Sequence, residues 1–174
     1  MLRKAACLML FGATTLALQS LPARADDAEI ARGKYLVTIS GCNDCHTPGY
    51  FFGKPDMARF LGGSDVGFEI PGLGVFVGPN LTPDETGLGD WSEEQIVAAL
   101  QTGVRPDGRH LAPIMPWHAF ANFTTEDVAA IAAFLKSLPP VSNKVPDPVG
   151  PGQTVSTFMF RILPPGATAA AAPQ

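Results

Sequence analysis

Residues Gly41-Cys42-Asn43-Asp44-Cys45-His46 bring two thiols and an imidazole close together in the chain. Side chains three and four positions apart share one face of a helix, so Cys42, Cys45 and His46 can face the same way. Cys-x-x-Cys-His is the signature of covalent c-type haem attachment, in which the histidine becomes the proximal ligand of the iron. A thioredoxin-like thiol pair and a zinc site also use Cys-x-x-Cys, so both remain alternatives at this point.

The N-terminal segment has the three parts of a secretory signal peptide. Arg3-Lys4 forms a positive n-region, Ala5 to Leu18 is an apolar run too short to span a bilayer, and Ala23-Arg24-Ala25 is an A-x-A cleavage site. We therefore expect residues 1–25 to be cleaved. The mature chain would begin at Asp26, lie in the periplasm and carry no transmembrane anchor. The alternative is an uncleaved N-terminal anchor.

The mature chain is expected to be acidic. The sequence has 12 Lys and Arg against 16 Asp and Glu, and Arg3, Lys4 and Arg24 leave with the signal peptide, so the formal charge becomes −7. Nucleic-acid binding requires a basic footprint, and nucleic acid is therefore excluded as a partner. The acidity either suits a protein partner with a positive docking patch or serves only solubility.

Only two of the three cysteines remain after cleavage, because Cys7 lies in the signal peptide. A disulfide between Cys42 and Cys45 would close a very short loop and stabilise little. Two thioether bonds to a haem would use both thiols and add a large apolar body to a small core. The cysteine count therefore favours one covalently bound haem c, with its iron, over a disulfide framework.

Apolar periodicity and capping signals predict three further helices. Ser92 and Gln95 form a capping box, and Gly103 follows the last periodic residue of that helix. Gly33 inside the first helix indicates either a close approach of another helix or a tolerated surface glycine. The expected helices cover Asp27–Ser40, Ser92–Thr102 and Thr124 or Thr125 to about Leu138.

The long segment Thr47–Gly89 is rich in Gly and Pro and is expected to be irregular. One exception is a short β-hairpin, in which Phe68-Glu69-Ile70 and Val75-Phe76-Val77 flank a turn at Pro71–Gly74. The segment also concentrates aromatic residues, which must pack either against a haem face or in an ordinary core. Val104–Phe123 is expected to be a second loop.

A sixth iron ligand has to come from a second place in the chain. Met115 has the most favourable context, since Pro113 and Pro116 stiffen its loop just before the last helix. A neutral thioether opposite a histidine raises the reduction potential and suits electron transfer. His110 and His118 are the alternatives, as is an open sixth site with Met115 as a core gap-filler.

Beyond Pro140 the composition shifts to Pro, Gly and Ala, which marks residues 142–174 as a C-terminal extension. Its apolar patch, Val155 to Leu163, is far too short to cross a membrane. This patch either folds back on the domain or docks on another subunit.

Several segments together resemble a class I bacterial cytochrome c, and they are similar to haem domains in cytochrome subunits of periplasmic dehydrogenases. They occur in the family's order between about residues 27 and 141. These segments are Gly41–His46, Gly78-Pro-Asn-Leu-Thr-Pro-Asp84, Gly87-Leu-Gly-Asp-Trp-Ser92, Gly103-Val-Arg-Pro-Asp-Gly-Arg109, Met115-Pro-Trp117 and Phe134-Leu-Lys-Ser-Leu-Pro-Pro140.

The resemblance implies a mainly α fold over residues 26–141, with the N- and C-terminal helices crossing beside the covalent haem. Cys42 and Cys45 would carry the thioethers, His46 and Met115 would bind the iron, and the carbonyl of Pro79 would accept a hydrogen bond from His46 Nδ1. Such a hydrogen bond fixes the ring and strengthens the ligand.

The function implied is that of an electron carrier and not an enzyme. It would transfer single electrons between a dehydrogenase and an oxidase or another cytochrome. The alternatives are an obligate cytochrome subunit of a dehydrogenase complex and a haem enzyme or sensor with an open sixth site.

Overall fold

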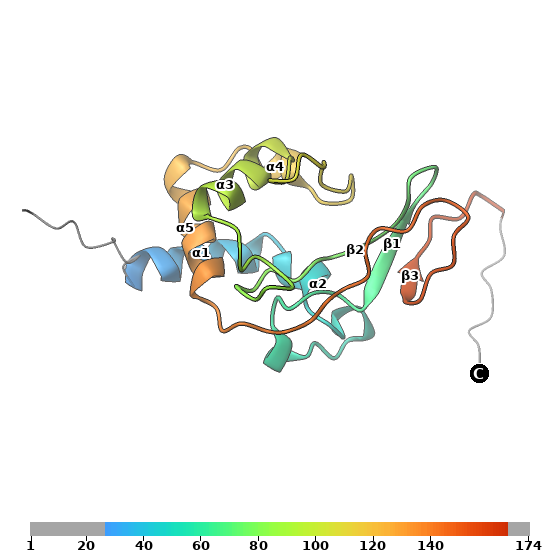
Figure 1. The fold of residues 1–174 in the computed structure, drawn as a ribbon, viewed down its shortest axis with the longest axis horizontal. Coiled ribbons are helices and arrows are strands. Elements are labelled where there is room, and N and C mark those ends of the chain that lie inside the picture. The colour runs from blue at the N-terminus through green and yellow to red at the C-terminus, as the bar shows by residue number, and fades with distance from the viewer. Residues whose placement is uncertain (1–26, 167–174) are drawn as a thin grey trace, which may run out of the picture.

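The computed structural model describes residues 27–166 (Figure 1). The expected signal peptide and the last eight residues of the extension, 167–174, lie outside the described residues. Within this range α1, α3, α4 and α5 gather at one end of the molecule and a three-stranded sheet lies at the other. The short helix α2 (Cys42–His46) lies between them (Figure 1). No helix among residues 27–166 is long and apolar enough to cross a bilayer.

The first and last predicted helices are confirmed as α1 (Asp27–Ile39) and α5 (Thr125–Ser137), and they pack against each other. A Cβ atom at Gly33 would lie 1.9 Å from the carbonyl oxygen of Ala130, which leaves no room for any side chain. Gly33 therefore marks a close approach of two helices and is not a surface glycine. Arg32 pairs with Asp127 in the first turn of α5, at 2.8 Å between Nε and Oδ1.

The predicted start and end of the third helix are confirmed in α3 (Glu93–Thr102). The Ser92 hydroxyl accepts from the Gln95 amide, the Gln95 side chain accepts from the Ser92 amide, and Gly103 ends the helix at φ 70°. Apolar residues of α1, α3 and α5 then form one core with two buried leucines from the loops between them. The buried members are Leu36, Val37, Leu61, Leu88, Ile96, Ile131, Ala132, Phe134 and Leu135.

The prediction of a continuous loop over Val104–Phe123 was wrong, because α4 (Trp117–Phe120) forms inside it. Four residues after a proline are too few to show apolar periodicity, so the helix depends on tertiary contacts. Phe120 is buried, and a Cβ at Gly103 would lie 2.4 Å from the Trp117 ring. The region Thr47–Gly89 also contains two short 3₁₀ helices, η1 (Tyr50–Phe52) and η2 (Met57–Arg59).

The predicted hairpin is confirmed as β1 (Val66–Ile70) paired antiparallel with β2 (Gly74–Val77), with Phe68 opposite Phe76. A third strand, β3 (Phe158–Phe160), was not predicted. It comes from the C-terminal extension and pairs parallel with β1, so the strand order is β2-β1-β3. The apolar patch of the extension therefore folds back on the domain, as the first of the two interpretations expected.

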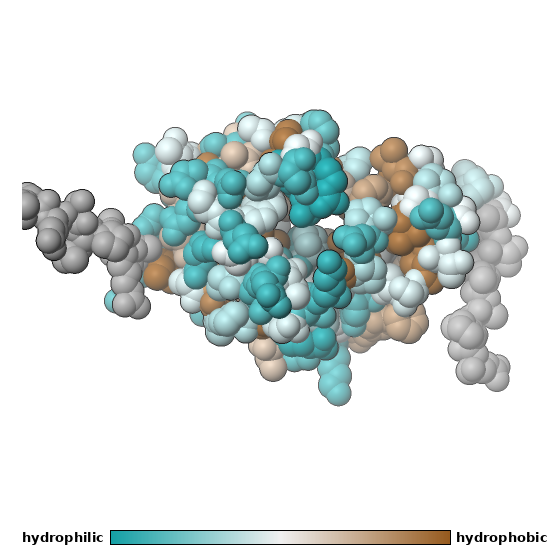
Figure 2. All heavy atoms as spheres, viewed as in Figure 1, coloured by the Kyte–Doolittle hydropathy of each residue, from teal (hydrophilic) through white to brown (hydrophobic). Residues whose placement is uncertain are grey.

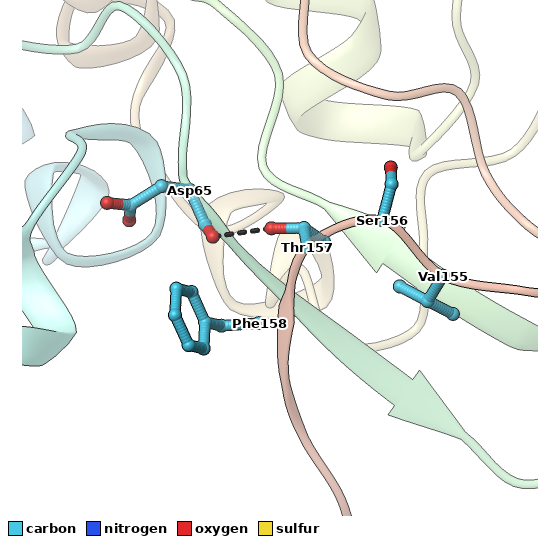
Figure 3. Close-up of a pocket in the computed structure, with 5 residues that line it drawn as sticks. All are labelled: Asp65, Val155, Ser156, Thr157 and Phe158. Atoms are coloured by element: carbon cyan, nitrogen blue, oxygen red, sulfur yellow. Dashed lines mark hydrogen bonds between the residues drawn. The ribbon is translucent and has the colours of Figure 1, made fainter. Parts of the chain in front are cut away.

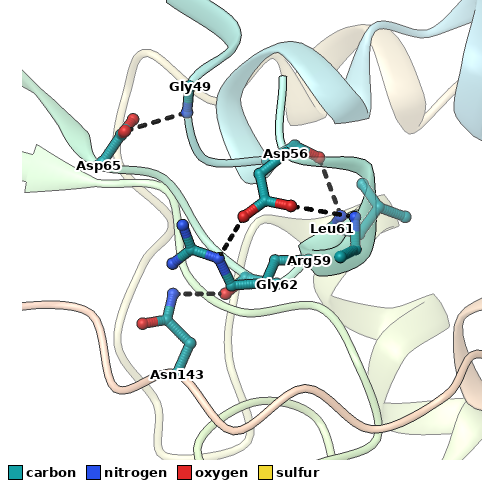
Figure 4. A network of polar contacts seen from close by, with 9 residues as sticks. Gly49, Asp56, Arg59, Leu61, Gly62, Asp65 and Asn143 are labelled. Atoms are coloured by element: carbon teal, nitrogen blue, oxygen red, sulfur yellow. Dashed lines mark hydrogen bonds and ion pairs between the residues drawn. The ribbon is translucent and has the colours of Figure 1, made fainter. Parts of the chain in front are cut away.

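Polar contacts hold the irregular segments and the start of the extension together (Figure 4). The Asn143 side chain donates to the Gly62 carbonyl at 2.7 Å, and the Gly49 amide donates to the Asp65 carboxylate at 3.0 Å. Buried Asn80 donates to the carbonyl of Val141 at 2.6 Å. These groups are satisfied by specific partners, which gives a Gly- and Pro-rich region one conformation.

We predict that Gly33→Ala destabilises the protein by about 1–3 kcal/mol, since the added methyl group forces α1 and α5 apart. A surface glycine in a helix would give the opposite sign, with alanine stabilising by roughly 1 kcal/mol. Thermal unfolding of the purified protein measures the difference. Lys34→Ala, on the exposed face of the same helix, is the control and should leave the melting temperature nearly unchanged.

Candidate haem site

The motif lies on α2, which follows α1 directly. Gly41 adopts φ 68° between the two helices, a left-handed conformation that glycine adopts without strain. The resulting turn presents both thiols and the imidazole to one cavity of about 320 Å³. The cavity is lined by Ser40, Gly41, Cys42, Asp44, Cys45, His46, Phe51, Phe68, Ile114, Met115, Pro116 and Phe120.

His46 is buried, and its Nδ1 lies 2.7 Å from the carbonyl oxygen of Pro79. The hydrogen bond expected from the resemblance is therefore present. A carbonyl only accepts, so Nδ1 carries the proton and Nε2 keeps a free lone pair. Burial lowers the pKa of His46, against a smaller opposing effect of the Pro79 hydrogen bond. At neutral pH the ring is thus a neutral imidazole, the form that binds a metal.

The loop that carries Pro79 is pressed onto α2. A Cβ at Gly78 would lie 1.8 Å from the carbonyl oxygen of Cys45 and 3.4 Å from His46 Nδ1. The Ser64 amide donates to the Gly78 carbonyl at 2.9 Å on the other side of the loop. Only glycine fits here, and its missing side chain lets the Pro79 carbonyl reach the histidine.

The thiols of Cys42 and Cys45 are half-buried and are not joined in a disulfide. Burial is the main effect that raises the pKa of Cys42, to about 11, and burial followed by the nearby Asp44 raises the pKa of Cys45. A reactive thiol pair needs at least one lowered pKa, so the thioredoxin-like alternative is disfavoured. Residues 27–166 contain no group of three or more His, Cys, Asp or Glu side chains placed to hold a metal ion.

The side chains that remain fit a haem c. The cavity offers two thiols for covalent attachment, a buried neutral imidazole and the thioether of Met115, while Phe51, Phe68, Ile114 and Phe120 give it an apolar lining. Imidazole and thioether are a known pair of iron ligands in electron-transfer haems. The cavity therefore offers groups that would hold a haem c: two thiols, an imidazole and a thioether.

The other candidates for the sixth ligand lie elsewhere. His110 and His118 are exposed, and neither lines the cavity. Met57 is 60% exposed on η2, and Met159 belongs to β3, where its sulfur lies 3.9 Å from the Arg161 guanidinium. Among the described residues, Met115 is thus the one predicted candidate that shares a cavity with Cys42, Cys45 and His46. Its role as an iron ligand stays a prediction.

A second hollow of about 490 Å³ is lined by Asp65 and by Val155, Ser156, Thr157 and Phe158 of the extension (Figure 3). The Thr157 hydroxyl donates to the backbone carbonyl of Asp65 at 2.5 Å and holds its two walls together (Figure 3). It is larger than the first cavity but offers no thiol, thioether or imidazole. Its chemistry does not suit haem iron.

A family model described as Cytochrome c matches residues 30–139. The chain belongs to the cytochrome c family. This membership confirms the family predicted from the sequence, and it implies a covalently bound haem c.

Three relatives share the segment. The cytochrome c subunit of alcohol dehydrogenase (quinone) from Gluconobacter oxydans (strain 621H) is 37% identical over 127 residues, 71% of this chain and 25% of the relative. The fructose dehydrogenase cytochrome subunit of Gluconobacter japonicus is 37% identical over 116 residues, 66% of this chain and 22% of the relative. A diheme cytochrome c-type protein of Cereibacter sphaeroides is 32% identical over 121 residues, 69% of this chain and 39% of the relative.

The chain thus spans about a quarter of the length of the first two of these relatives. Both are named as cytochrome subunits, and the family match covers residues 30–139 of the predicted haem segment, residues 26–141. These findings agree with the prediction of an electron carrier that is not itself an enzyme.

Sequence reasoning missed several residues of the site. Phe51 and Phe68 belonged to the predicted aromatic cluster, but nothing in the sequence separated them from their aromatic neighbours. Phe120 was hidden in the predicted loop, and Gly78 was noted only as part of a family segment. A glycine directly before Pro79 was the one available signal that the backbone there approaches another chain segment closely.

We predict that Gly78→Ala disturbs the site more than the fold. The methyl group must push the Pro79 loop away from α2, which costs about 1–3 kcal/mol of stability and lengthens the hydrogen bond to His46. A histidine that loses this bond is a less basic ligand, so the reduction potential should rise. Potentiometric titration of the purified protein measures it. Gly150→Ala is the control, because φ of Gly150 is not positive and an added Cβ there would meet its nearest neighbour, the Gln153 side-chain oxygen, at an ordinary 3.5 Å. An unchanged potential in Gly78→Ala would contradict the role given to this loop.

Proposed function

We propose that this chain is a periplasmic, mono-haem class I cytochrome c that transfers single electrons from a dehydrogenase to an oxidase or another cytochrome. The observation that carries the proposal is the cavity that gathers Cys42, Cys45, His46 and Met115. The single Cys-x-x-Cys-His in the sequence supports one haem. The packing of α1 against α5 supports the class I arrangement, in which the first and last helices cross beside the haem.

The side chains of the cavity would have two roles, covalent attachment of the haem and coordination of its iron. Cys42 and Cys45 would hold the haem covalently, and His46 and Met115 would occupy the two axial positions. When bound, the haem supplies an iron that alternates between the ferrous and ferric states. Axial positions filled by protein keep small molecules from the iron, so electron transfer is favoured over chemistry on a substrate.

The backbone around Met115 supports this role. The Met115 amide donates to the carbonyl of Ala112 at 2.8 Å, and the Trp117 amide donates to the carbonyl of Met115 at 2.8 Å. Pro113 and Pro116 add fixed φ angles to the same turn. A side chain on such a rigid turn loses little entropy when it binds, and this suits a thioether, which is a weak ligand.

We predict that Met115→Ala abolishes the weak long-wavelength charge-transfer band of a ferric iron bound by a thioether. Met115→His should restore a six-coordinate iron but lower the reduction potential by a few tenths of a volt, within the roughly 0.8 V range that axial ligands set. Absorption spectra and potentiometry of the purified protein measure both. Met57→Ala, an exposed methionine outside the cavity, should retain the wild-type spectrum. A band that survives in Met115→Ala would refute the assignment and favour an open site or another ligand.

A second candidate is a permanent subunit of a dehydrogenase complex. The relatives favour it, since several are named as cytochrome subunits of dehydrogenases and extend well beyond the segment that this chain matches. In this case the haem would accept electrons from one permanently bound donor, and the protein would not diffuse between partners.

We predict that the tagged chain, recovered from a periplasmic extract at moderate salt, elutes alone if it is a free carrier. A permanent subunit would elute with a dehydrogenase polypeptide in fixed stoichiometry, because such interfaces survive dilution. N-terminal sequencing of the same sample tests the proposed location, since a cleaved chain begins at Asp26. A chain that retains Met1 and fractionates with the cytoplasm would contradict export.

A further inference from the structure

The wall of the haem cavity contains two phenylalanines that a third ring supports from behind. Phe51 of η1 and Phe68 of β1 line the cavity, with their ring centroids 5.5 Å apart. Phe160 of β3 contacts both, edge-on to Phe51 at 4.9 Å and stacked on Phe68 at 5.5 Å. Each ring of this trio thus touches the other two. Two belong to the haem domain, whereas the third belongs to the C-terminal extension.

Directional contacts hold Phe160 in this place. Its strand pairs with β1 so that Phe160 lies opposite Phe68. Just before the strand, the Thr157 hydroxyl donates to the Asp65 carbonyl (Figure 3). Just after the strand, the Arg161 guanidinium pairs with the Glu69 carboxylate. Apolar contact alone would allow the segment to slide, whereas these two polar contacts fix its register.

The extension is anchored before it reaches β3 as well. Val149 and Val75 exchange two backbone hydrogen bonds, at 2.8 and 3.0 Å, and a Cβ at Gly74 would lie 2.0 Å from the Val149 carbonyl oxygen. Together with the Asn143–Gly62 contact, this lays the extension along the domain from the end of α5 to the sheet (Figure 1). Contacts from Asn143 to Arg161 therefore set the position of Phe160.

Phe158 provides a comparison within the same strand. Alternate residues of a strand share a face, so Phe158 and Phe160 point the same way. Phe158 contacts Phe52, at 5.1 Å between centroids, and Phe52 is not among the residues that line the haem cavity. Both phenylalanines of β3 thus contact a phenylalanine of η1. Of these two pairs, only Phe51–Phe160 includes a residue that lines the cavity. Apolar residues, brown in Figure 2, gather at this sheet end of the molecule.

We propose that the C-terminal extension is a strap that completes the haem cavity, with Phe160 as the positioning residue that holds Phe51 and Phe68 in its wall. The proposal rests on the haem site described above. A tight wall keeps water from the haem on this side. Water stabilises the ferric state, which carries one more positive charge than the ferrous state, so its exclusion raises the reduction potential. The extension thereby tunes the electron carrier without touching either axial ligand.

The test compares Phe160→Ala with Phe158→Ala in the full-length haem protein. Phe160→Ala should lower the reduction potential enough to change the ferrous-to-ferric ratio several-fold at a fixed ambient potential, where tenfold corresponds to 59 mV for one electron. Phe158→Ala removes the same side chain from the same strand and should leave the potential unchanged. Phe160→Tyr keeps the aromatic ring and should retain the wild-type reduction potential.

Two further measurements keep the outcome unambiguous. The thioether charge-transfer band, retained in Phe160→Ala, shows that the axial ligands are intact, and a pyridine haemochrome assay gives the haem content of every variant. If Phe160→Ala fails to fold, the double variant Thr157→Val, Arg161→Gln takes its place. It removes the two polar contacts of β3 but keeps all the phenylalanine rings, and it should also lower the reduction potential.

Equal shifts of the reduction potential in Phe160→Ala and Phe158→Ala, or no shift in Phe160→Ala, would refute the proposed role of the extension. Wild-type protein without covalent haem would instead overturn the proposed function, so the two failures are distinguishable. A loss of melting temperature without a change in potential would mean that Phe160 serves stability alone, which also refutes the proposal.

Discussion

The contact between the Gly78–Thr82 segment and α2 is the constraint on which the rest of the site depends. Gly78 lies against the carbonyl of Cys45, and this places the Pro79 carbonyl within 2.7 Å of His46 Nδ1. Asn80 is buried next to them and bonds both to Thr82 and to the carbonyl of Val141. One short loop thus orients the histidine, joins the core and receives the start of the C-terminal extension.

The helical core provides the support for this loop. The close approach of α1 and α5 at Gly33 fixes the direction in which α1 ends, and α2 follows after a single left-handed glycine. The motif therefore follows directly from the packed pair of helices α1 and α5. Lys136 of α5 adds to the support, since its ammonium donates to the carbonyls of Leu88, Gly89 and Trp91 at 2.9–3.1 Å. These bonds hold the loop between Asn80 and α3 in place.

The opposite end of the molecule is built differently. Among residues 27–166 the sheet has three strands, and the side chain of Phe158 on its edge strand β3 is 69% exposed. Phe160 of this strand contacts Phe51 in the cavity wall, whereas Phe158 contacts Phe52, which does not line the cavity. The cavity is lined by residues of the helices α2 and α4 and of the strand β1, which pairs with β3 of the extension.

Much of the local structure followed from the sequence by itself, because its causes are local. The helix that carries Cys42–His46, the capping box of Ser92 and Gln95, and the hairpin around Pro71–Gly74 each depend on residues a few positions apart. The tertiary structure alone decided which candidate shares a cavity with His46, since His110 and Met115 lie in the loop before α4 and His118 lies on α4 itself. It also decided that Phe160 reaches Phe68, a pairing between segments far apart in the chain. Contacts of this kind depend on the packing of the whole chain, and no local pattern records them.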